Sequence, residues 1–305
     1  MRTISLLPAA LVLLLTSACS QAQSNKTADK TADLPSVEAT APKKGDDRHK
    51  DEAAAAEIVG LTKVGSIKGI VPESSGLAPA DADQSYFSFG DDGNSATLYE
   101  ITGAGKLVRT LEVPTTNHDW ESLSRDGRGN YYIGDCGNNG SDRRDLKIYK
   151  FRPDAPKTVG TIAFTYPDQR EFPPKKKQCN FDCEASLWHD GQVYLFTKDR
   201  GQKRTSKVYS VSDQPGTYTA KMVTSLAIPG EVTDAALRAD GHRLVLLGRG
   251  ELFILDGNSW PEILKATPRE ISLNGAGQTE GAVFKDDNTL LISTEKGDLY
   301  EYKLP

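Results

Sequence analysis

From residue 58 to the C-terminus, short apolar runs alternate with small clusters of polar turn residues. The runs are rich in Tyr, Val, Ile, Leu and Phe, and Gly, Asp and Asn separate them. Runs of this kind predict β-strands, and the clusters between them predict tight turns. We therefore expect an all-β domain over residues 58–305.

One module recurs five times in this region. Each copy has an acidic residue, small and aliphatic positions, a turn, an aromatic-aliphatic strand, a second turn and a second strand. A further strand candidate follows each of the first four copies, and an unmatched candidate, residues 61–70, precedes the first. The copies begin 48, 63, 50 and 46 residues apart, at Glu73, Glu121, Glu184, Asp234 and Glu280.

This repeat predicts a β-propeller of five four-stranded blades. The strand before the first copy would complete the last blade, which closes the ring and removes exposed sheet edges. A sixth blade is an alternative, but it would have to lie in the longest interval, where residues 166–180 have the composition of a loop with two adjacent prolines. A two-sheet sandwich is a second alternative, although it requires neither equal spacing nor an unmatched N-terminal strand.

Several short motifs in residues 71–304 resemble a family of secreted bacterial β-propeller proteins. They read ESSGL, HDWESL, YIGDCGNN, LKIYKF, NFDCEASLW, YLFTKDRG, VTDAAL and QTEGAVF. That family has no established activity to carry over. The chain is more distantly similar to phytase-like and lactonase-like propellers, which are usually six-bladed and depend on calcium. This second resemblance implies a bound calcium ion and the hydrolysis of phosphate esters or lactones.

The first eighteen residues have the pattern of a secretory signal peptide. Arg2 precedes an apolar run from Leu6 to Leu15, which as a helix would span about 15 Å, half the hydrocarbon core of a bilayer. Residues 15–19, LTSAC, resemble the lipobox of bacterial lipoproteins, in which the cysteine is acylated and becomes the mature N-terminus. The resemblance implies a lipid on Cys19 and, with Ser20 after it, an outer-membrane lipoprotein of the bacterial cell envelope.

Residues 19–57 are predicted to form a disordered tether. This segment has no Phe, Tyr or Trp and interleaves Lys with Asp, so it cannot bury enough apolar surface to offset the entropy of ordering it. The chain therefore divides into a signal peptide (1–18), a tether (19–57) and a propeller domain (58–305).

The charge balance argues against a nucleic-acid partner. Lys and Arg number 37 and Asp and Glu 42, which gives a net charge of −5, whereas nucleic-acid binding requires clustered positive charge. The partners we expect are the membrane, through the lipid on Cys19, and a protein or small-molecule ligand that the sequence does not identify.

Carboxylates recur at the start of each predicted innermost strand, and equivalent positions of all blades meet at the central channel. Two further acids precede such a residue by two positions, on the same side of an extended strand. Crowded carboxylates need protons, cationic partners or a metal, and all-oxygen ligands favour calcium. The alternative is structural, with the acids accepting backbone N–H groups and pairing with basic residues. The candidate calcium ligands are Glu73, Asp119, Glu121, Asp182, Glu184, Asp234 and Glu280.

A second set of charged residues is expected where the second strands end. Lys198 and Arg249 fall there and could neutralise part of the acidic ring, and His118 adjoins the Asp119 motif as a candidate acid or base. No Gly-rich nucleotide loop and no GxSxG motif occurs, so the sequence predicts no catalytic constellation. The basic or polar residues expected at the channel mouth are His118, Lys198, Arg200 and Arg249.

Three cysteines remain if Cys19 is acylated. An odd number outside the cytoplasm implies one disulfide and one free thiol, or three free thiols. Cys136 and Cys179 both lie in loop-like segments, whereas Cys183 lies on a predicted inner strand. We therefore expect the disulfide between Cys136 and Cys179.

Two functions stay open at this stage. The first is a lipid-anchored binding or scaffold module, with a calcium ion at its channel. The second is a calcium-dependent hydrolase of phosphate esters or lactones. A hydrolase needs a positioned base and an electrophile in addition to acids, so the sequence favours the binding module.

Overall fold

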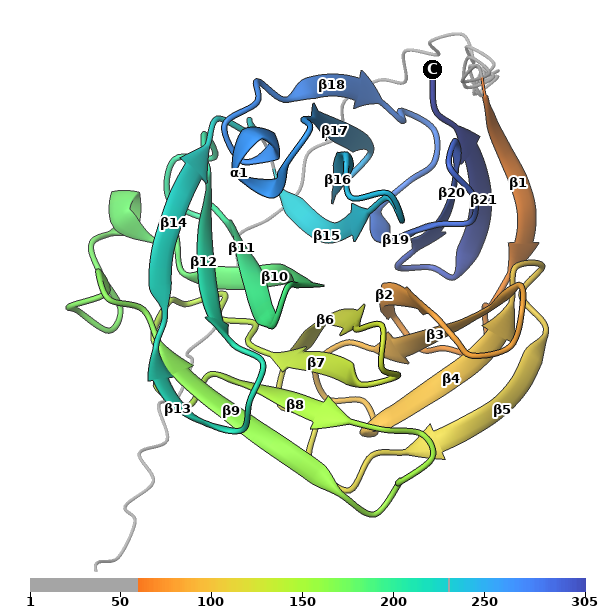
Figure 1. Ribbon diagram of the computed structural model, residues 1–305, viewed down its shortest axis with the longest axis horizontal. Helices are drawn as coiled ribbons and strands as arrows, with labels where there is room; N and C mark the ends of the chain where they lie inside the picture. The colour runs from red at the N-terminus through yellow and green to blue at the C-terminus, as the bar shows by residue number, and fades with distance from the viewer. Residues whose placement is uncertain (1–59, 230) are drawn as a thin grey trace, which may run out of the picture. The chain divides into compact units, whose positions relative to one another are not determined.

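The computed structural model describes residues 60–229 and 231–305 and places their strands in five sheets around a common centre (Figure 1). In each sheet the strand nearest the centre is followed outward by the next strands of the chain. The chain is therefore a five-bladed β-propeller, which confirms the predicted fold class and blade count. The predicted signal peptide, the lipid site Cys19 and the predicted tether lie outside the described residues.

Each blade takes one strand from each of four concentric rows, and the rows below give blades one to five in order. The inner strands are β2 (Ser74–Pro79), β6 (Trp120–Arg125), β10 (Asp182–His189), β15 (Val232–Leu237) and β19 (Thr279–Phe284). The second strands are β3 (Ser85–Gly90), β7 (Tyr131–Asp135), β11 (Gln192–Lys198), β16 (Arg243–Gly248) and β20 (Thr289–Thr294). The third strands are β4 (Thr97–Thr102), β8 (Lys147–Phe151), β12 (Ser206–Ser212), β17 (Glu251–Asp256) and β21 (Asp298–Lys303). The outer strands are β5 (Leu107–Glu112), β9 (Val159–Thr165), β14 (Lys221–Leu226), β18 (Arg269–Ser272) and β1 (Leu61–Ser66).

The N-terminal strand closes the ring. β1 pairs antiparallel with β21, with Leu61 opposite Tyr302, and so supplies the fourth strand of the last blade. This is the closure that the unmatched strand predicted. The first and last strands of the described residues are thereby held in one sheet, which closes the ring.

Apolar side chains form five clusters, one between each pair of neighbouring blades. The cluster between blades one and two, for example, joins Phe87, Trp120 and Tyr131, all of which are buried. Both faces of a blade are covered by its neighbours, which explains why a second strand such as β16 reads as a continuous apolar run. Burial of these faces fixes the strand register, because a slip of one residue would turn each apolar side chain to the other face.

Three elements were not expected from the repeat. β13 (Gly216–Thr219) leaves the β12–β14 connection and pairs parallel with β9 of the neighbouring blade. The short helices η1 (Lys176–Gln178) and α1 (Trp260–Ile263) lie in connections. Residues 166–180 contain no strand, so no sixth blade is hidden there. No helix among the described residues is long and apolar enough to cross a membrane.

Candidate functional site

Each inner strand carries an irregularity of register near its start, and this irregularity decides which acids face the channel. In β6, β10 and β19 the residue skipped in the pairing is Glu121, Glu184 and Glu280, respectively. A bulged residue is released from the ladder and its side chain is re-aimed. All three glutamates line one cavity of about 70 Å³.

The other two inner strands place their acids differently. In β15 the skipped residue is Thr233, and in β2 the skipped residues are Ser75 and Gly76. Asp234 therefore follows the bulged residue instead of being the bulged residue itself. Its two oxygens accept the backbone N–H groups of Ala235 and Ala282, both at 2.8 Å, which joins blade four to blade five. Asp234 thus has the structural role that the sequence left open as the alternative.

Glu73 precedes β2 and stays exposed at the rim of the cavity. Its backbone is in the left-handed region, with φ of 46°, which is uncommon for a residue with a long side chain. Its carboxylate accepts a hydrogen bond from the Asn94 amide at 3.1 Å.

In blade three the acids are neutralised by basic side chains from the end of β11. The Lys198 ammonium lies 2.9 Å from Glu184, and both side chains are buried, at 0 % and 4 % exposure. Arg200 lies 2.6 Å from Asp182 and 2.8 Å from Glu184. Burial and the neighbouring Asp182 carboxylate raise the pKa of Glu184, and the positive charge of Lys198 opposes that rise.

Glu280 in blade five has a looser cationic partner. The Arg249 Nε lies 3.3 Å from Glu280 and 3.6 Å from Glu231, and the arginine side chain is 39 % exposed. Burial raises the pKa of Glu280, while Arg249 and Lys198 act in the opposite direction. Glu231 also approaches Lys198 at 3.9 Å and so joins the ion pairs of blades three and four.

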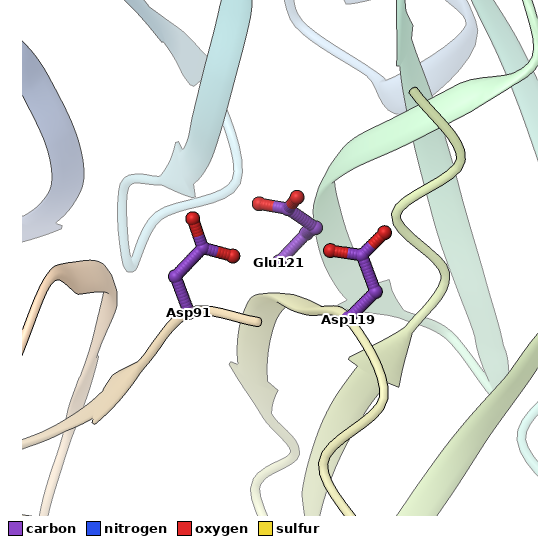
Figure 2. Close-up of side chains that lie close together, drawn as sticks. All are labelled: Asp91, Asp119 and Glu121. Atoms are coloured by element: carbon purple, nitrogen blue, oxygen red, sulfur yellow. The ribbon is translucent and has the colours of Figure 1, made fainter. Parts of the chain in front are cut away.

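In blades one and two the acids face one another instead. Asp91 follows β3, Asp119 precedes β6 and Glu121 lies in β6, and the three carboxylates converge on one space (Figure 2). One oxygen from each lies within 4.8 Å of the other two. We call these three residues the acidic triad.

The triad is short of positive charge. Among the described residues, the one ion pair recorded for its members joins Asp119 to Arg143 at 3.9 Å. That guanidinium is already occupied, since it donates to Asp135 at 2.8 Å and to the Gly137 carbonyl at 2.7 Å. Ser75 donates to Glu121 at 3.3 Å, which is a neutral contact.

Burial and mutual repulsion disfavour the charged form of the triad. Burial raises the pKa of Asp119 to about 6, and the Asp182 and Asp91 carboxylates add to the rise. Burial also raises the pKa of Glu121 well above its usual range, with Glu184 and Asp91 adding to it. The pKa of Asp91 is raised mainly by burial. Carboxylates in this condition bind protons or a cation.

Two neighbouring residues hold the triad in place. The Asn117 amide donates to the carbonyls of Gly90 and Asp91 at 2.9 and 3.0 Å, and its oxygen accepts the N–H of Trp120 at 3.0 Å. The end of β3 is thereby fixed beside the start of β6. Gly137 contacts the Asp119 carboxylate so closely that a Cβ atom there would lie 2.4 to 2.6 Å from it.

The structure adds two residues that the sequence analysis did not assign to the acid network. Glu231 joins the ion pairs of Lys198 and Arg249, and Arg143 supports Asp119. Asp91 belongs to the charged residues expected where the second strands end, and the structure brings it into the triad. Arg143 lies in a connection whose course is not evident from the repeat.

His118 lies at the surface, with 55 % of its side chain exposed, and its Nδ1 is 3.8 Å from Asp145. It is not among the residues that line the channel cavity. The predicted partners Cys136 and Cys179 are both free thiols in the structure, and Cys136 lies against Cys183. The part of the loop next to Cys179 packs against blade three, where Lys177 contacts Gly201 and Gln202.

Two other cavities differ from the channel mouth in chemistry. The far ends of the inner strands line a largely apolar cavity of about 230 Å³ that includes Leu77, Leu123 and Leu237. A polar cavity of about 480 Å³ lies between residues 168–181 and 199–207. Neither brings carboxylates together as the channel mouth does, since among the described residues the acidic triad is the one such group found.

No family model matches the chain, and no curated protein matches its sequence. Three solved structures are similar in fold. The PQQ-bound aldose sugar dehydrogenase from Streptomyces coelicolor is 11% identical, covers 80% of this chain and 97% of its own, and has a TM-score of 0.45. The glutaminyl cyclase from Myxococcus xanthus is 9% identical, covers 82% and 97%, and has a TM-score of 0.50. A chain of the mitotic checkpoint complex is 12% identical, covers 75% and 60%, and has a TM-score of 0.39. At 9% identity the likeness to the glutaminyl cyclase is one of fold alone.

Proposed function

We propose that this β-propeller is a calcium-dependent binding module whose ligand site is the acidic end of its channel. The observation that carries the proposal is the acidic triad, in which three carboxylates from two blades converge. Among the described residues, the one basic group paired with them is Arg143, which also holds Asp135. Asp91, Asp119 and Glu121 would supply charged oxygen ligands, the kind that calcium prefers, and water would complete the coordination. The absence of His or Cys from the triad argues against a transition metal.

The other acids of the ring support this assignment by contrast. Glu184 and Glu280 occupy the same bulged position as Glu121, yet each has a basic partner within 3.3 Å. A bound metal ion would therefore neutralise more negative charge at blades one and two than at blades three and five, where basic side chains already pair with the glutamates. A cation there would also tie those two blades together, because Asp91 belongs to blade one and the other two ligands to blade two.

The test is thermal unfolding of the purified domain with chelator and with added calcium. A ligand that binds only the folded state stabilises it by about 2.7 kcal/mol at a hundredfold excess over Kd, which for a domain of this size is a rise in Tm of roughly 5 to 10 °C. We expect this response to shrink in Glu121→Gln and in Asp119→Asn.

Glu280→Gln is the matched control, because it changes the same residue type at the equivalent bulge of blade five. It should keep the calcium response. A wild-type Tm that is equal in chelator and in calcium would overturn the proposal, as would a full response in Glu121→Gln.

One observation favours the hydrolase alternative. A carboxyl group with a pKa of about 6, as at Asp119, can act as a general acid or base near neutral pH. Incubating the calcium-loaded protein with a panel of phosphate monoesters and lactones separates the two functions, because only the hydrolase turns a substrate over.

We also propose that the propeller is carried at the bacterial outer membrane through a lipid on Cys19. The supporting observation is the signal-like segment followed by LTSAC. Cys19→Ser should release the protein from the membrane fraction, and a variant that still fractionates with membranes as a lipid-bearing species would contradict the anchor.

A further inference from the structure

Two of the three free cysteines of the propeller lie side by side at the junction of blades two and three. Cys136 directly follows β7 of blade two, and Cys183 lies in β10, the inner strand of blade three. The Cys183 N–H donates to the Cys136 carbonyl at 3.4 Å, and the Cys136 Sγ lies 3.5 Å from the Cys183 carbonyl oxygen. The backbones are therefore in direct contact where the two side chains meet.

The two thiols share one buried environment. Both residues are 0 % exposed and belong to the apolar cluster between blades two and three. The neighbouring Cys183 thiol and burial raise the pKa of Cys136 well above its usual range. A disulfide requires two cysteines whose backbones are close, and the backbone hydrogen bond between these two residues meets that requirement.

Cys179 is not part of this arrangement. It is half-buried beside η1, where its Sγ lies 3.8 and 3.9 Å from the carbonyl oxygens of Lys175 and Pro174. Its surroundings are thus its own loop rather than either of the other thiols.

We propose that Cys136 and Cys183 form a disulfide that joins blades two and three when the chain folds in an oxidising environment. The two thiols lose two protons and two electrons, and a small-molecule disulfide such as oxidised glutathione takes up the electrons and protons and leaves as two thiols. The exchange occurs during folding, before the sulfurs are enclosed. Cys179 stays a free thiol.

The bond would fasten two strands that carry the channel acids. Asp119 packs against Gly137, the residue after Cys136, and Cys183 lies between Asp182 and Glu184. The disulfide would close a loop of nearly fifty residues in the unfolded chain, so we expect the oxidised protein to melt about 10 °C above the reduced protein. This expectation does not depend on calcium.

The experiment refolds the chain without its signal peptide, with Cys19→Ser so that the three cysteines of the propeller are the ones present. Refolding is carried out in oxidised and reduced glutathione, and free thiols are then alkylated under denaturing conditions. An endoprotease that cleaves before aspartate separates Cys179 from Cys183 at Asp182, so mass spectrometry distinguishes all three pairings. We expect a linked peptide that contains Cys136 and Cys183, with Cys179 alkylated.

Cys179→Ser is the matched control and should keep both the cross-link and the Tm difference between oxidised and reduced protein. Cys183→Ala should lose both, and comparing the two redox forms of the wild type keeps the test valid if that variant folds poorly. A linked peptide that contains Cys179, or three alkylated thiols after oxidative refolding, would overturn the proposal.

Discussion

Two halves of the acidic channel mouth share the same β-bulge but use the glutamate at that bulge differently. Glu121 in blade two and Glu184 in blade three are both skipped in the pairing of their inner strands, and both side chains reach the same cavity. The difference lies in the second strand. In blade three, Lys198 is paired with Asp182, which lies two positions before the bulged Glu184. Counted from the bulge in the same way, the equivalent residues of blade two are Asp119 and Cys136, so a cysteine stands where blade three has the lysine.

A difference in charge at this one position of the strand pairing therefore separates the two halves. We call blade three, where Glu184 forms an ion pair, the closed half, and we call blades one and two, where Glu121 faces other acids, the open half. In blade three the lysine neutralises the bulged glutamate inside the fold. In blade two the cysteine at that position supplies no positive charge, and the glutamate faces Asp91 and Asp119. The comparison teaches that a shared acid is not evidence of a shared role, because the neighbouring strand decides whether its charge is available to a ligand.

The largest expected effect on stability comes from removing the lysine of the buried ion pair in blade three. In Lys198→Met the lysine charge is removed while most of the side-chain volume stays, which leaves Glu184 buried beside Asp182. Removing one partner of a buried pair costs about 3 to 5 kcal/mol of unfolding free energy. Urea unfolding measures the loss. Arg249→Met, whose side chain is 39 % exposed, should cost about 1 kcal/mol or less, and equal losses would refute the distinction between these two ion pairs.

The open half should respond to pH in the opposite sense from an ordinary ion pair. The pKa of Asp119 is about 6 in the folded protein against 3.8 for a free carboxyl, so the folded state binds the proton more tightly. Stability then falls as pH rises between these values. From pH 5.0 to 7.5 in chelator, Asp119 alone should remove about 1.4 kcal/mol.

Denaturant unfolding at the two pH values measures this change, and Asp119→Asn is the comparison, since it removes the titrating group. The variant should lose that part of the pH dependence. If wild type and variant lose stability equally between pH 5.0 and 7.5, the Asp119 carboxyl is not protonated in the folded state as we describe.

The sequence was sufficient for the fold because the repeat is carried by turn chemistry and strand composition, which are local. The four spacings and the unmatched strand at residues 61–70 predicted the blades and their closure. The site was less predictable, because a bulge depends on pairing with the next strand. Asp234 and Glu121 look alike in the repeat, yet a difference of one position in the bulge sends Asp234 to backbone N–H groups and Glu121 to the channel.

The basic partners of the channel acids could be predicted in part from the same repeat. Lys198 and Arg249 stood out as basic residues at the ends of second strands, where they do meet Glu184 and Glu280. Glu231 and Arg143 lie outside the module, so nothing in the repeat marked them. The neighbours of the cysteines were not predictable for a related reason, since residues 166–180 had no predicted path and the contact of Cys136 with Cys183 joins two blades.

The smallest effect is the one that separates stability from ligand binding within the triad. Asp91→Asn removes one of three mutually repelling charges, and at a separation near 4.8 Å we expect it to stabilise the calcium-free protein by about 1 kcal/mol after screening. The asparagine keeps one oxygen as a neutral ligand, so calcium should bind about tenfold more weakly rather than not at all.

Asp92→Asn is the matched control, because it changes the adjacent acid, which lies outside the triad, and it should keep most of the calcium response. Thermal melts in chelator and across a calcium titration give both quantities for each variant. A ligand site predicts opposite signs, with Asp91→Asn gaining stability without calcium and losing affinity with it. If Asp91→Asn is instead destabilised in chelator and responds to calcium as the wild type does, then Asp91 belongs to the structural acids of the ring, and the difference between the two halves of the channel mouth reduces to Asp119 and Glu121.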